Sequence, residues 1–139
     1  MKKCLIALFM FVTVWGCTSE ATQEIQWIYG LSKSLKLAQE ENKPLMVDFY
    51  ADWCIWCKRL DRRTYRHSGV IELSSNFVCV KIDTDKNPRY VRRYSIRGLP
   101  TIIFLKPNGE IIERVLGYRD GKTLTEIMSK VIKKNDKTQ

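Results

Sequence analysis

The sequence predicts an α/β domain in which a central mixed sheet of four to five strands is flanked by helices. Short apolar runs of strand length alternate with amphipathic segments of helical period along most of the chain. Helical segments separate the first apolar runs from one another, which favours parallel pairing of those strands. An Asn-Gly pair at residues 108–109 separates the last two runs and predicts a hairpin, so the final two strands are expected to be antiparallel.

Length and charge restrict the class of protein. The 139 residues are enough for one domain with a single modest core. The hydrophobic fraction of 45% and the charged fraction of 28% are ordinary for a globular protein. The formal charge is +9, but the lysines and arginines are spread along the chain instead of being gathered into an arm. We therefore expect a solvated basic surface and no nucleic-acid partner.

Residues 1–16 have the pattern of a secretory signal peptide. Two lysines precede about a dozen uncharged, mostly apolar residues, a run too short to span a bilayer, which needs about 20. The sequence V-W-G-C that ends at Cys17 resembles a bacterial lipobox, which implies cleavage before Cys17 and lipidation of this cysteine. Trp15 departs from the small residue that is usual at its position. Ordinary secretion or an uncleaved anchor is therefore the alternative.

The rest of the chain divides into a tether, one domain and a tail. Residues 17–26 are mostly small and polar, and they predict a short tether between the lipid on Cys17 and the folded domain. The domain is expected over residues 27–134, followed by a polar tail over residues 135–139. Removal of the signal peptide with its two lysines would lower the formal charge from +9 to +7.

The first half of the domain is expected to contain two helices and a buried strand. Residues 31–42 carry apolar side chains on one face and end at an Asn-Lys-Pro sequence, which predicts an amphipathic helix. Residues 45–51 form a short, mostly apolar run and predict a buried strand, in which Asp48 is the single charge. The pattern over residues 54–65 is helical, and residues 70–73 add a further turn or two.

The second half is expected to contain three strands and two helices. Residues 77–82 predict a strand, and residues 87–94 predict a short helix with a proline in its first turn. Residues 101–105 and 111–116 predict the two strands of the hairpin. Thr123–Glu126 has the sequence of a capping box and predicts the start of the final helix. The expected order is therefore α-β-α-β-α-β-β-α.

Cys54 and Cys57 form a C-x-x-C motif whose chemistry is limited by the rest of the chain. A zinc site needs four ligands, but Cys79 stands alone in an apolar run and His67 is the only histidine. Covalent haem needs a histidine directly after the second cysteine, where this chain has Lys58. A static disulfide is the remaining alternative, although so small a loop restricts the unfolded chain little. A working dithiol is favoured.

The predicted position of the motif explains how it could work. Cys54 follows a buried strand and begins a helix, whose positive amino-terminal end favours a thiolate over a thiol. Cys57 falls one helical turn later on the same side, so the two sulfur atoms can meet. We expect Cys54 to be exposed and to attack a disulfide. We expect Cys57 to be more buried and to resolve the mixed disulfide.

Asp48 and Pro100 are two further candidate site residues. A carboxylate inside an apolar strand is costly unless it has a partner or a task. Burial raises its pKa, so Asp48 is a candidate to accept the proton of Cys57; the alternative is an aspartate bonded to backbone at the margin of the strand. Pro100 directly precedes an apolar strand and is a candidate for the cis form, with an ordinary trans proline as the alternative.

Taken together, the motifs resemble the thioredoxin superfamily over residues 27–134. They are V-D-F-Y-A-D-W-C-x-x-C-K at residues 47–58, K-I-D at 81–83, R-G-L-P-T at 97–101, and the Asn-Gly hairpin with Gly117 beyond it. The Y-A-D-W-C-x-x-C-K form is most similar to the C-terminal periplasmic domain of the disulfide reductase DsbD and to small exported thioredoxin-like lipoproteins. The resemblance implies the thioredoxin fold. It also implies that Cys54 is the nucleophile, Cys57 the resolving thiol, Asp48 the buried acid and Pro100 the cis-proline.

The resemblance also implies a substrate-binding surface around the two cysteines. Leu99, beside Pro100, would offer backbone hydrogen bonds to an extended substrate, and Trp53 would pack beside the site. Ile55 and Trp56 depart from the Gly-Pro of cytoplasmic thioredoxin, and Trp56 could narrow the choice of partner. The oxidising members of the superfamily have a histidine before the second cysteine, and this chain has none. A strongly oxidising potential is therefore not expected.

These expectations lead to a specific function. The protein is expected to be a monomeric thiol–disulfide oxidoreductase, anchored by lipid in the bacterial cell envelope. It would take electrons from a membrane thiol carrier and reduce disulfides in exported proteins such as apocytochrome c or another oxidoreductase. It would need no dissociable cofactor and no metal, because the cysteine pair is the redox group. The alternatives are a disulfide oxidase or isomerase, a binding module without turnover, and a soluble periplasmic or secreted protein.

Overall fold

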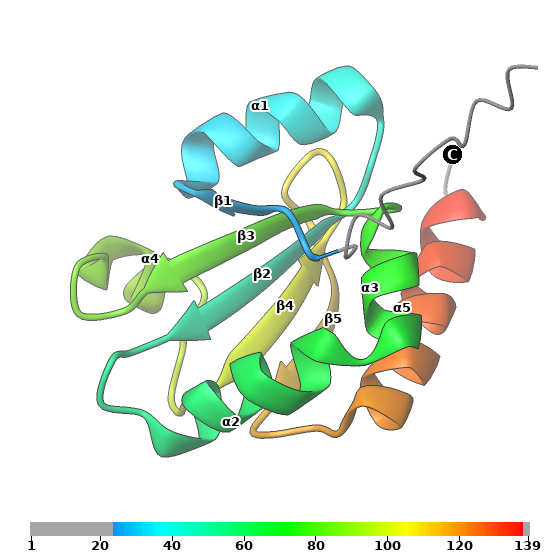
Figure 1. The fold of residues 1–139 in the computed structure, drawn as a ribbon. Coiled ribbons are helices and arrows are strands. Elements are labelled where there is room, and N and C mark those ends of the chain that lie inside the picture. Colours follow the sequence, from blue (N-terminus) through cyan, green and yellow to red (C-terminus); the bar gives the residue numbers. More distant parts are fainter. Residues whose placement is uncertain (1–23, 138–139) are drawn as a thin grey trace, which may run out of the picture.

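The computed structural model describes residues 24–137, which form a five-stranded mixed sheet with helices on both faces (Figure 1). This arrangement confirms the predicted fold class. The predicted signal peptide, Cys17 and most of the predicted tether lie outside the described residues. The strands are β1 (Trp27–Tyr29), β2 (Leu45–Tyr50), β3 (Val78–Asp83), β4 (Thr101–Leu105) and β5 (Ile111–Leu116).

The strands lie in the order β1-β3-β2-β4-β5. β1 and β2 both pair in parallel with β3, whereas β4 runs antiparallel to β2, and β5 runs antiparallel to β4. β1 is the element that sequence periodicity missed, because three residues are too few to show an alternating pattern. Its three residues form a strand because they pair in parallel with β3, beginning with Trp27 opposite Cys79.

Helices cover the two faces unequally. Figure 1 shows α1 on one side of the sheet and α2, α3 and α5 on the other. α4 belongs with α1, since its buried Tyr90 lies in the same hydrophobic cluster as Leu31 of α1. No helix within residues 24–137 has the length and apolar character needed to cross a bilayer. The helices are α1 (Leu31–Glu41), α2 (Ile55–Arg63), α3 (Ser68–Ser74), α4 (Pro88–Arg93) and α5 (Gly121–Asp136), with a 3₁₀ turn at Thr64–Arg66.

Both faces of β2 are buried, and its alternation places Asp48. Val47 and Phe49 point into the cluster under α1 and α4, whereas Met46 points into the cluster under α2, α3 and α5. Asp48 alternates with Val47 and Phe49, so it faces the same side as Met46. The parallel register sets Asp48 opposite Lys81 of β3. Two charged side chains of opposite sign therefore lie side by side on this face of the sheet.

The start of α5 corrects one sequence prediction. The N-cap is Asp120, whose Oδ1 accepts a hydrogen bond from the Thr123 backbone N–H at 2.8 Å, so the helix begins at Gly121. The capping box predicted at Thr123–Glu126 is wrong: Thr123 occupies the third helical position. Both Asp and Thr are good N-caps, and the spacing rule does not decide between them.

The ends of the domain extend beyond the predicted limits of residues 27 and 134. Ile25, which the sequence placed in the tether, is buried in the cluster under α2, α3 and α5. At the other end α5 continues to Asp136, and Asn135 is 5% exposed. The apolar contacts of Ile25 and the last turn of α5 therefore belong to the folded domain.

Truncation of Leu60 should show how much the packing of α2 on the sheet contributes to the stability of the domain. Leu60 is fully buried, and we expect Leu60→Ala to lower the free energy of unfolding by about 2–5 kcal/mol through lost apolar contact and the cavity left behind. Leu116→Ala makes the same chemical change at a side chain that is 57% exposed, and should cost less than about 1 kcal/mol. Urea unfolding of the full chain measures both. Equal losses in the two variants would contradict the described packing of α2.

Candidate active site: the Cys54–Cys57 pair

The turn from β2 into α2 places Cys54 at the amino-terminal end of the helix. The Cys54 backbone N–H donates to the Ala51 carbonyl at 3.1 Å, which closes the turn, and the Cys54 carbonyl accepts from Lys58 N–H at 3.1 Å. Cys54 is the N-cap of α2, and its Sγ accepts the Cys57 backbone N–H at 3.1 Å. A sulfur atom thus occupies the place usually taken by a Ser or Asp oxygen. The positive end of the helix favours negative charge on that sulfur.

Cys54 and Cys57 are joined as a disulfide, with their Cα atoms 5.2 Å apart. Cys54 is 5% exposed and Cys57 3% exposed. The expectation that Cys54 is exposed is therefore wrong for the oxidised pair, although the order of burial is as expected. The reason is local packing: Ala51 lies with both cysteines in one buried cluster, and Tyr50 and Leu99 pack against it.

The loop before β4 brings Leu99 and Pro100 to the cysteine pair. The Leu99–Pro100 peptide bond is cis. The sequence makes Pro100 a candidate for this form. The Pro100 carbonyl accepts the Gly117 N–H at 2.8 Å, and the Thr101 hydroxyl donates to the Gly98 carbonyl at 2.7 Å. Hydrogen bonds on both sides of the proline therefore fix the loop against the sheet, with Leu99 beside the disulfide.

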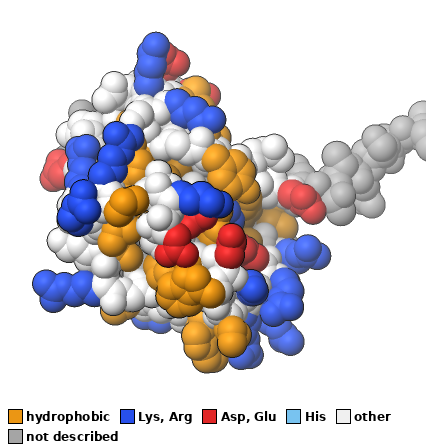
Figure 2. All heavy atoms as spheres, turned by 90° about the vertical axis from the view of Figure 1, so that its left-hand side faces the viewer, with side chains coloured by type: hydrophobic (Ala, Val, Ile, Leu, Met, Phe, Trp, Pro, Cys, Tyr) orange, Lys and Arg blue, Asp and Glu red, His pale blue; other side chains and the backbone are white. Residues whose placement is uncertain are grey.

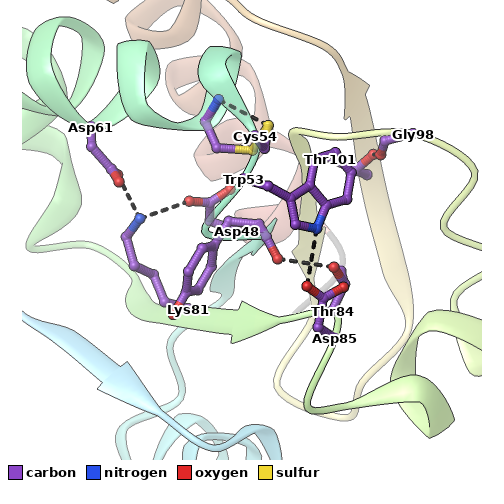
Figure 3. Close-up of a disulfide and its surroundings, with 11 residues drawn as sticks. Asp48, Trp53, Cys54, Asp61, Lys81, Thr84, Asp85, Gly98 and Thr101 are labelled. Atoms are coloured by element: carbon purple, nitrogen blue, oxygen red, sulfur yellow. Dashed lines mark hydrogen bonds and ion pairs between the residues drawn. A yellow bond between two sulfur atoms is a disulfide. The ribbon is translucent and has the colours of Figure 1, made fainter.

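Asp48 is 1% exposed and forms an ion pair with Lys81 (Figure 3). The Lys81 ammonium lies 3.1 Å from Asp48 Oδ2 and 2.5 Å from Asp61 Oδ1, so one cation bridges a strand carboxylate and a carboxylate from α2. The other oxygen of Asp48, Oδ1, is buried and has no hydrogen-bond partner within the described residues. Lys81 therefore pairs with only one of the two oxygens of Asp48.

Burial raises the pKa of Asp48, and the nearby Lys81 ammonium offsets only part of this effect. Burial acts to lower the pKa of Lys81, but the carboxylates of Asp48 and Asp61 outweigh it and raise the pKa of this ammonium. Lys81 therefore stays charged, whereas the pKa of Asp48 lies above its ordinary value of 3.8. A buried carboxyl with these properties can accept and return a proton.

A cavity of about 420 Å³ lies beside the Lys81–Asp61 ion pair. Its lining includes both of these residues together with Trp27 and Tyr65. Three aromatic rings surround the ammonium, with centroids 4.9 to 5.3 Å from Lys81 Nζ, and so hold the cation in place. The cavity therefore connects the Lys81–Asp61 pair to solvent by a path that does not run past the disulfide. The rings are those of Trp27, Tyr50 and Tyr65.

The large apolar side chains around the pair are exposed. Trp53, Ile55 and Trp56 are 68%, 73% and 51% exposed. Trp53 donates its Nε1–H to Asp85 Oδ2 at 3.0 Å, which ties the β2–α2 turn to the loop after β3 (Figure 3). The predicted substrate-binding residues Trp53, Ile55 and Trp56 thus form, with the partly buried Leu99, an apolar surface around the disulfide.

Sequence reasoning missed Lys81 and Asp61 as parts of the site. Lys81 carried a usable signal, because it is a charge inside an apolar strand just as Asp48 is. Asp61 carried none, since exposed acids are common on helices. Cys79 lies outside the site: it is a free, buried thiol, and burial raises its pKa to about 12. No cluster of three or more His, Cys, Asp or Glu side chains that could hold a metal occurs in residues 24–137.

Comparison with known proteins places this geometry in a family. The model of the thioredoxin-like domain family matches residues 31–132. The chain belongs to the thioredoxin-like family. This membership confirms the resemblance seen in the sequence motifs. The thioredoxin-like chain has its Cys54–Cys57 pair at disulfide distance, an arrangement that suggests thiol–disulfide redox activity.

Individual relatives agree with this assignment. The thiol:disulfide interchange protein DsbD of Pseudoalteromonas atlantica is 31% identical over 128 residues, which cover 81% of this chain but only 22% of the relative. The M-type chloroplast thioredoxin of Spinacia oleracea is 34% identical over 128 residues, covering 89% of this chain and 66% of the relative. A solution structure of a Thermus thermophilus thioredoxin superposes with a TM-score of 0.73 at 26% identity, covering 81% of this chain and 90% of that one.

Replacement of Asp48 should stabilise the thioredoxin-like fold at neutral pH. Because folding raises the pKa of Asp48 above its ordinary value of 3.8, the folded state binds the proton more tightly than the unfolded chain. As the pH rises above 3.8, the buried carboxylate therefore increasingly destabilises the fold. We expect Asp48→Asn to raise the free energy of unfolding at pH 7, a gain that disappears below the ordinary pKa of 3.8.

Urea unfolding of the full chain at several pH values measures this dependence. Asp136→Asn makes the same chemical change at an exposed position and should not reproduce it. A loss of stability in Asp48→Asn at pH 7 would contradict the account, because it would show that Lys81 needs Asp48 in addition to Asp61 as a counter-ion.

Proposed function

We propose that this protein is an exported thiol–disulfide oxidoreductase that reduces disulfides in proteins of the bacterial cell envelope. The observation that carries the proposal is the position of the Cys54–Cys57 pair: Cys54 Sγ caps the amino terminus of α2 and lies within bonding distance of Cys57. Membership of the thioredoxin-like family and similarity to DsbD support it. The apolar surface around the pair gives a protein substrate a place to bind.

The first half of the reaction transfers one substrate sulfur to the enzyme. The Cys54 thiolate, favoured by the amino terminus of α2, attacks one sulfur of the substrate disulfide. The substrate S–S bond breaks, and a bond between Cys54 and the attacked sulfur forms. The other substrate sulfur leaves as a thiolate and takes a proton from solvent. The substrate is then held to Cys54 by a mixed disulfide.

The second half releases the reduced substrate. Cys57 gives its thiol proton to Asp48, and the resulting thiolate attacks Cys54 Sγ. The mixed disulfide breaks, the Cys54–Cys57 disulfide forms, and the second substrate thiolate leaves and is protonated. Two electrons have passed from the enzyme to the substrate. When a donor dithiol reduces the pair again, Cys57 leaves as a thiolate and takes its proton back from Asp48.

The residues between the cysteines favour the reducing direction. A histidine before the second cysteine would stabilise the thiolate and thereby make the pair a stronger oxidant; Trp56 has this place and supplies no charge. The electron donor in this proposal is a membrane thiol carrier, and the recipients are exported proteins such as apocytochrome c or another oxidoreductase. A disulfide oxidase or isomerase is the alternative if the reduction potential of the Cys54–Cys57 pair lies near about −120 mV, the value of a strong oxidant.

The location follows from the amino-terminal segment. Residues 1–16 have the pattern of a signal peptide, and Cys17 is the proposed site of lipidation, so the domain would be anchored to a membrane of the envelope. Similarity to DsbD supports an envelope location. A soluble periplasmic or secreted form is the alternative if Cys17 is not modified.

Substitution of Cys57 should trap substrates. Without the resolving thiol, the mixed disulfide on Cys54 cannot be broken from within, so Cys57→Ser expressed in its native envelope should accumulate covalent adducts. The adducts are detected as bands that disappear on addition of reductant, and mass spectrometry identifies the attached proteins.

The double variant Cys54→Ser/Cys57→Ser is the matched control and should form none of these adducts. The opposite finding, in which partners bind both variants equally well under reducing conditions and no covalent species forms, would favour a binding module without turnover.

A further inference from the structure

The exposed side of α2 carries a concentration of positive charge directly beside the redox pair. Residues 58–66 contain five Lys or Arg residues and one acid, Asp61, which is already paired with Lys81. Ile55, Arg59, Arg62 and Arg63 are spaced to lie on one face of the helix, and they line an open hollow of about 450 Å³. We call this surface the arginine face.

The arginine face has no counter-ions of its own. Every ion pair within residues 24–137 uses a lysine, and no arginine in this part of the chain lies within 4.0 Å of a carboxylate. Arg62 makes only a hydrogen bond from Nε to the Lys58 carbonyl at 3.3 Å. The guanidinium groups therefore keep most of their donors available for an external anion.

Arg59 is held in position for such a contact. Its guanidinium lies 5.3 Å from the ring centroid of Trp56 and 5.3 Å from that of Tyr118. Stacking uses the faces of the planar group and leaves its N–H edges free, and these edges match a carboxylate in a bidentate arrangement. Because Trp56 lies between the two cysteines in the sequence, the contact ties Arg59 to the first turn of the helix that carries the redox pair.

A helix-dipole effect alone does not account for the arrangement. Cations are favoured in the last turn of a helix, which explains Arg62 and Arg63, and α4 has Arg92 and Arg93 in the same position. It does not explain Arg59, which lies in the middle of α2. Nor does it explain the hollow shared with Ile55. The α4 pair therefore supplies a matched control for the two last-turn arginines.

We propose that the arginine face binds acidic side chains that flank the disulfide of a protein substrate, an inference that rests on the proposed reductase function. The hollow adjoins Ile55, so an anion bound there lies at the edge of the apolar surface that receives the substrate cysteine. A substrate with Asp or Glu near its disulfide would gain charge-assisted hydrogen bonds, and its approach would be steered toward Cys54.

The surface as a whole fits a protein segment better than an anionic membrane. Figure 2 shows hydrophobic side chains at the lower end of the molecule, with acidic side chains above them and basic side chains to their right. Asp52 directly precedes the exposed Trp53 in the sequence, and Asp85 accepts the indole N–H of Trp53. These carboxylates would repel anionic headgroups, and a lipid surface pressed against Ile55 would also block the disulfide.

Peptide reduction tests the inference. Three peptides with the same disulfide are compared, in which the residues flanking the cysteines are Asp, Asn or Lys, and the dithiothreitol-reduced full chain is the reductant. We expect the Asp peptide to be reduced fastest and the Lys peptide slowest at low ionic strength, with the difference shrinking as salt is added. In Arg62→Gln/Arg63→Gln, the ratio of the Asp-peptide rate to the Asn-peptide rate should fall about three- to tenfold.

The double variant Arg92→Gln/Arg93→Gln removes the same charge from α4 and should leave that ratio unchanged. An equal fall in both variants would overturn the inference, because only net charge would then matter. Equal rates for the Asp and Asn peptides in the unmodified chain would overturn it while leaving the reductase function intact. Failure to reduce even the Asn peptide would instead overturn the proposed function, and this inference with it.

Vesicles of phosphatidylglycerol, compared with vesicles of phosphatidylcholine, separate the lipid alternative. The inference expects Arg62→Gln/Arg63→Gln to bind the two kinds of vesicle as the unmodified chain does. A selective loss of phosphatidylglycerol binding, with peptide rates unchanged, would show that the arginine face contacts lipid and would overturn the proposal.

Discussion

The hydrogen bond from the Cys57 backbone N–H to Cys54 Sγ is the interaction on which the site depends. It forms because α2 begins immediately after the turn that closes on Ala51, at the end of a strand buried in the centre of the sheet. One cysteine therefore caps the helix while the other lies a turn further along. If the helix began one residue later, the sulfur of Cys54 would lose both the donor and the positive end of the helix.

Asp48 and Lys81 are charged residues at buried strand positions, where apolar side chains are the usual choice. An apolar residue at position 48 would suit the buried strand β2, because burial of the Asp48 carboxylate is unfavourable and raises its pKa. Lys81 limits this cost through its ion pair with Asp48, while Asp61 contacts the same ammonium. Within residues 24–137 Asp48 Oδ1 has no hydrogen-bond partner, which suits the proton transfer that we propose for this residue. In this proposal, stability is lost at a position that serves the chemistry.

Features that depend on neighbouring residues could be predicted from the sequence, and features that depend on register could not. The hairpin at residues 108–109, the strand around Asp48 and the helix that follows Cys54 all leave local patterns. The bridge from Lys81 to Asp61 depends on the pairing of β2 with β3 and on how α2 crosses them, which no local pattern encodes. β1 is too short to show a period, and the N-cap Asp120 competes with Thr123, an equally suitable residue type, three positions along.

The proposed function requires that Cys54 and Cys57 form a reversible dithiol that gives electrons to a substrate. Equilibration of the full chain with redox buffers of known potential, followed by alkylation and mass analysis, tests this claim most directly. We expect a two-electron transition with a midpoint between about −200 and −270 mV, the range of the reducing and intermediate members of the fold. A midpoint near about −120 mV, or a pair that cannot be reduced while the domain is folded, would contradict it.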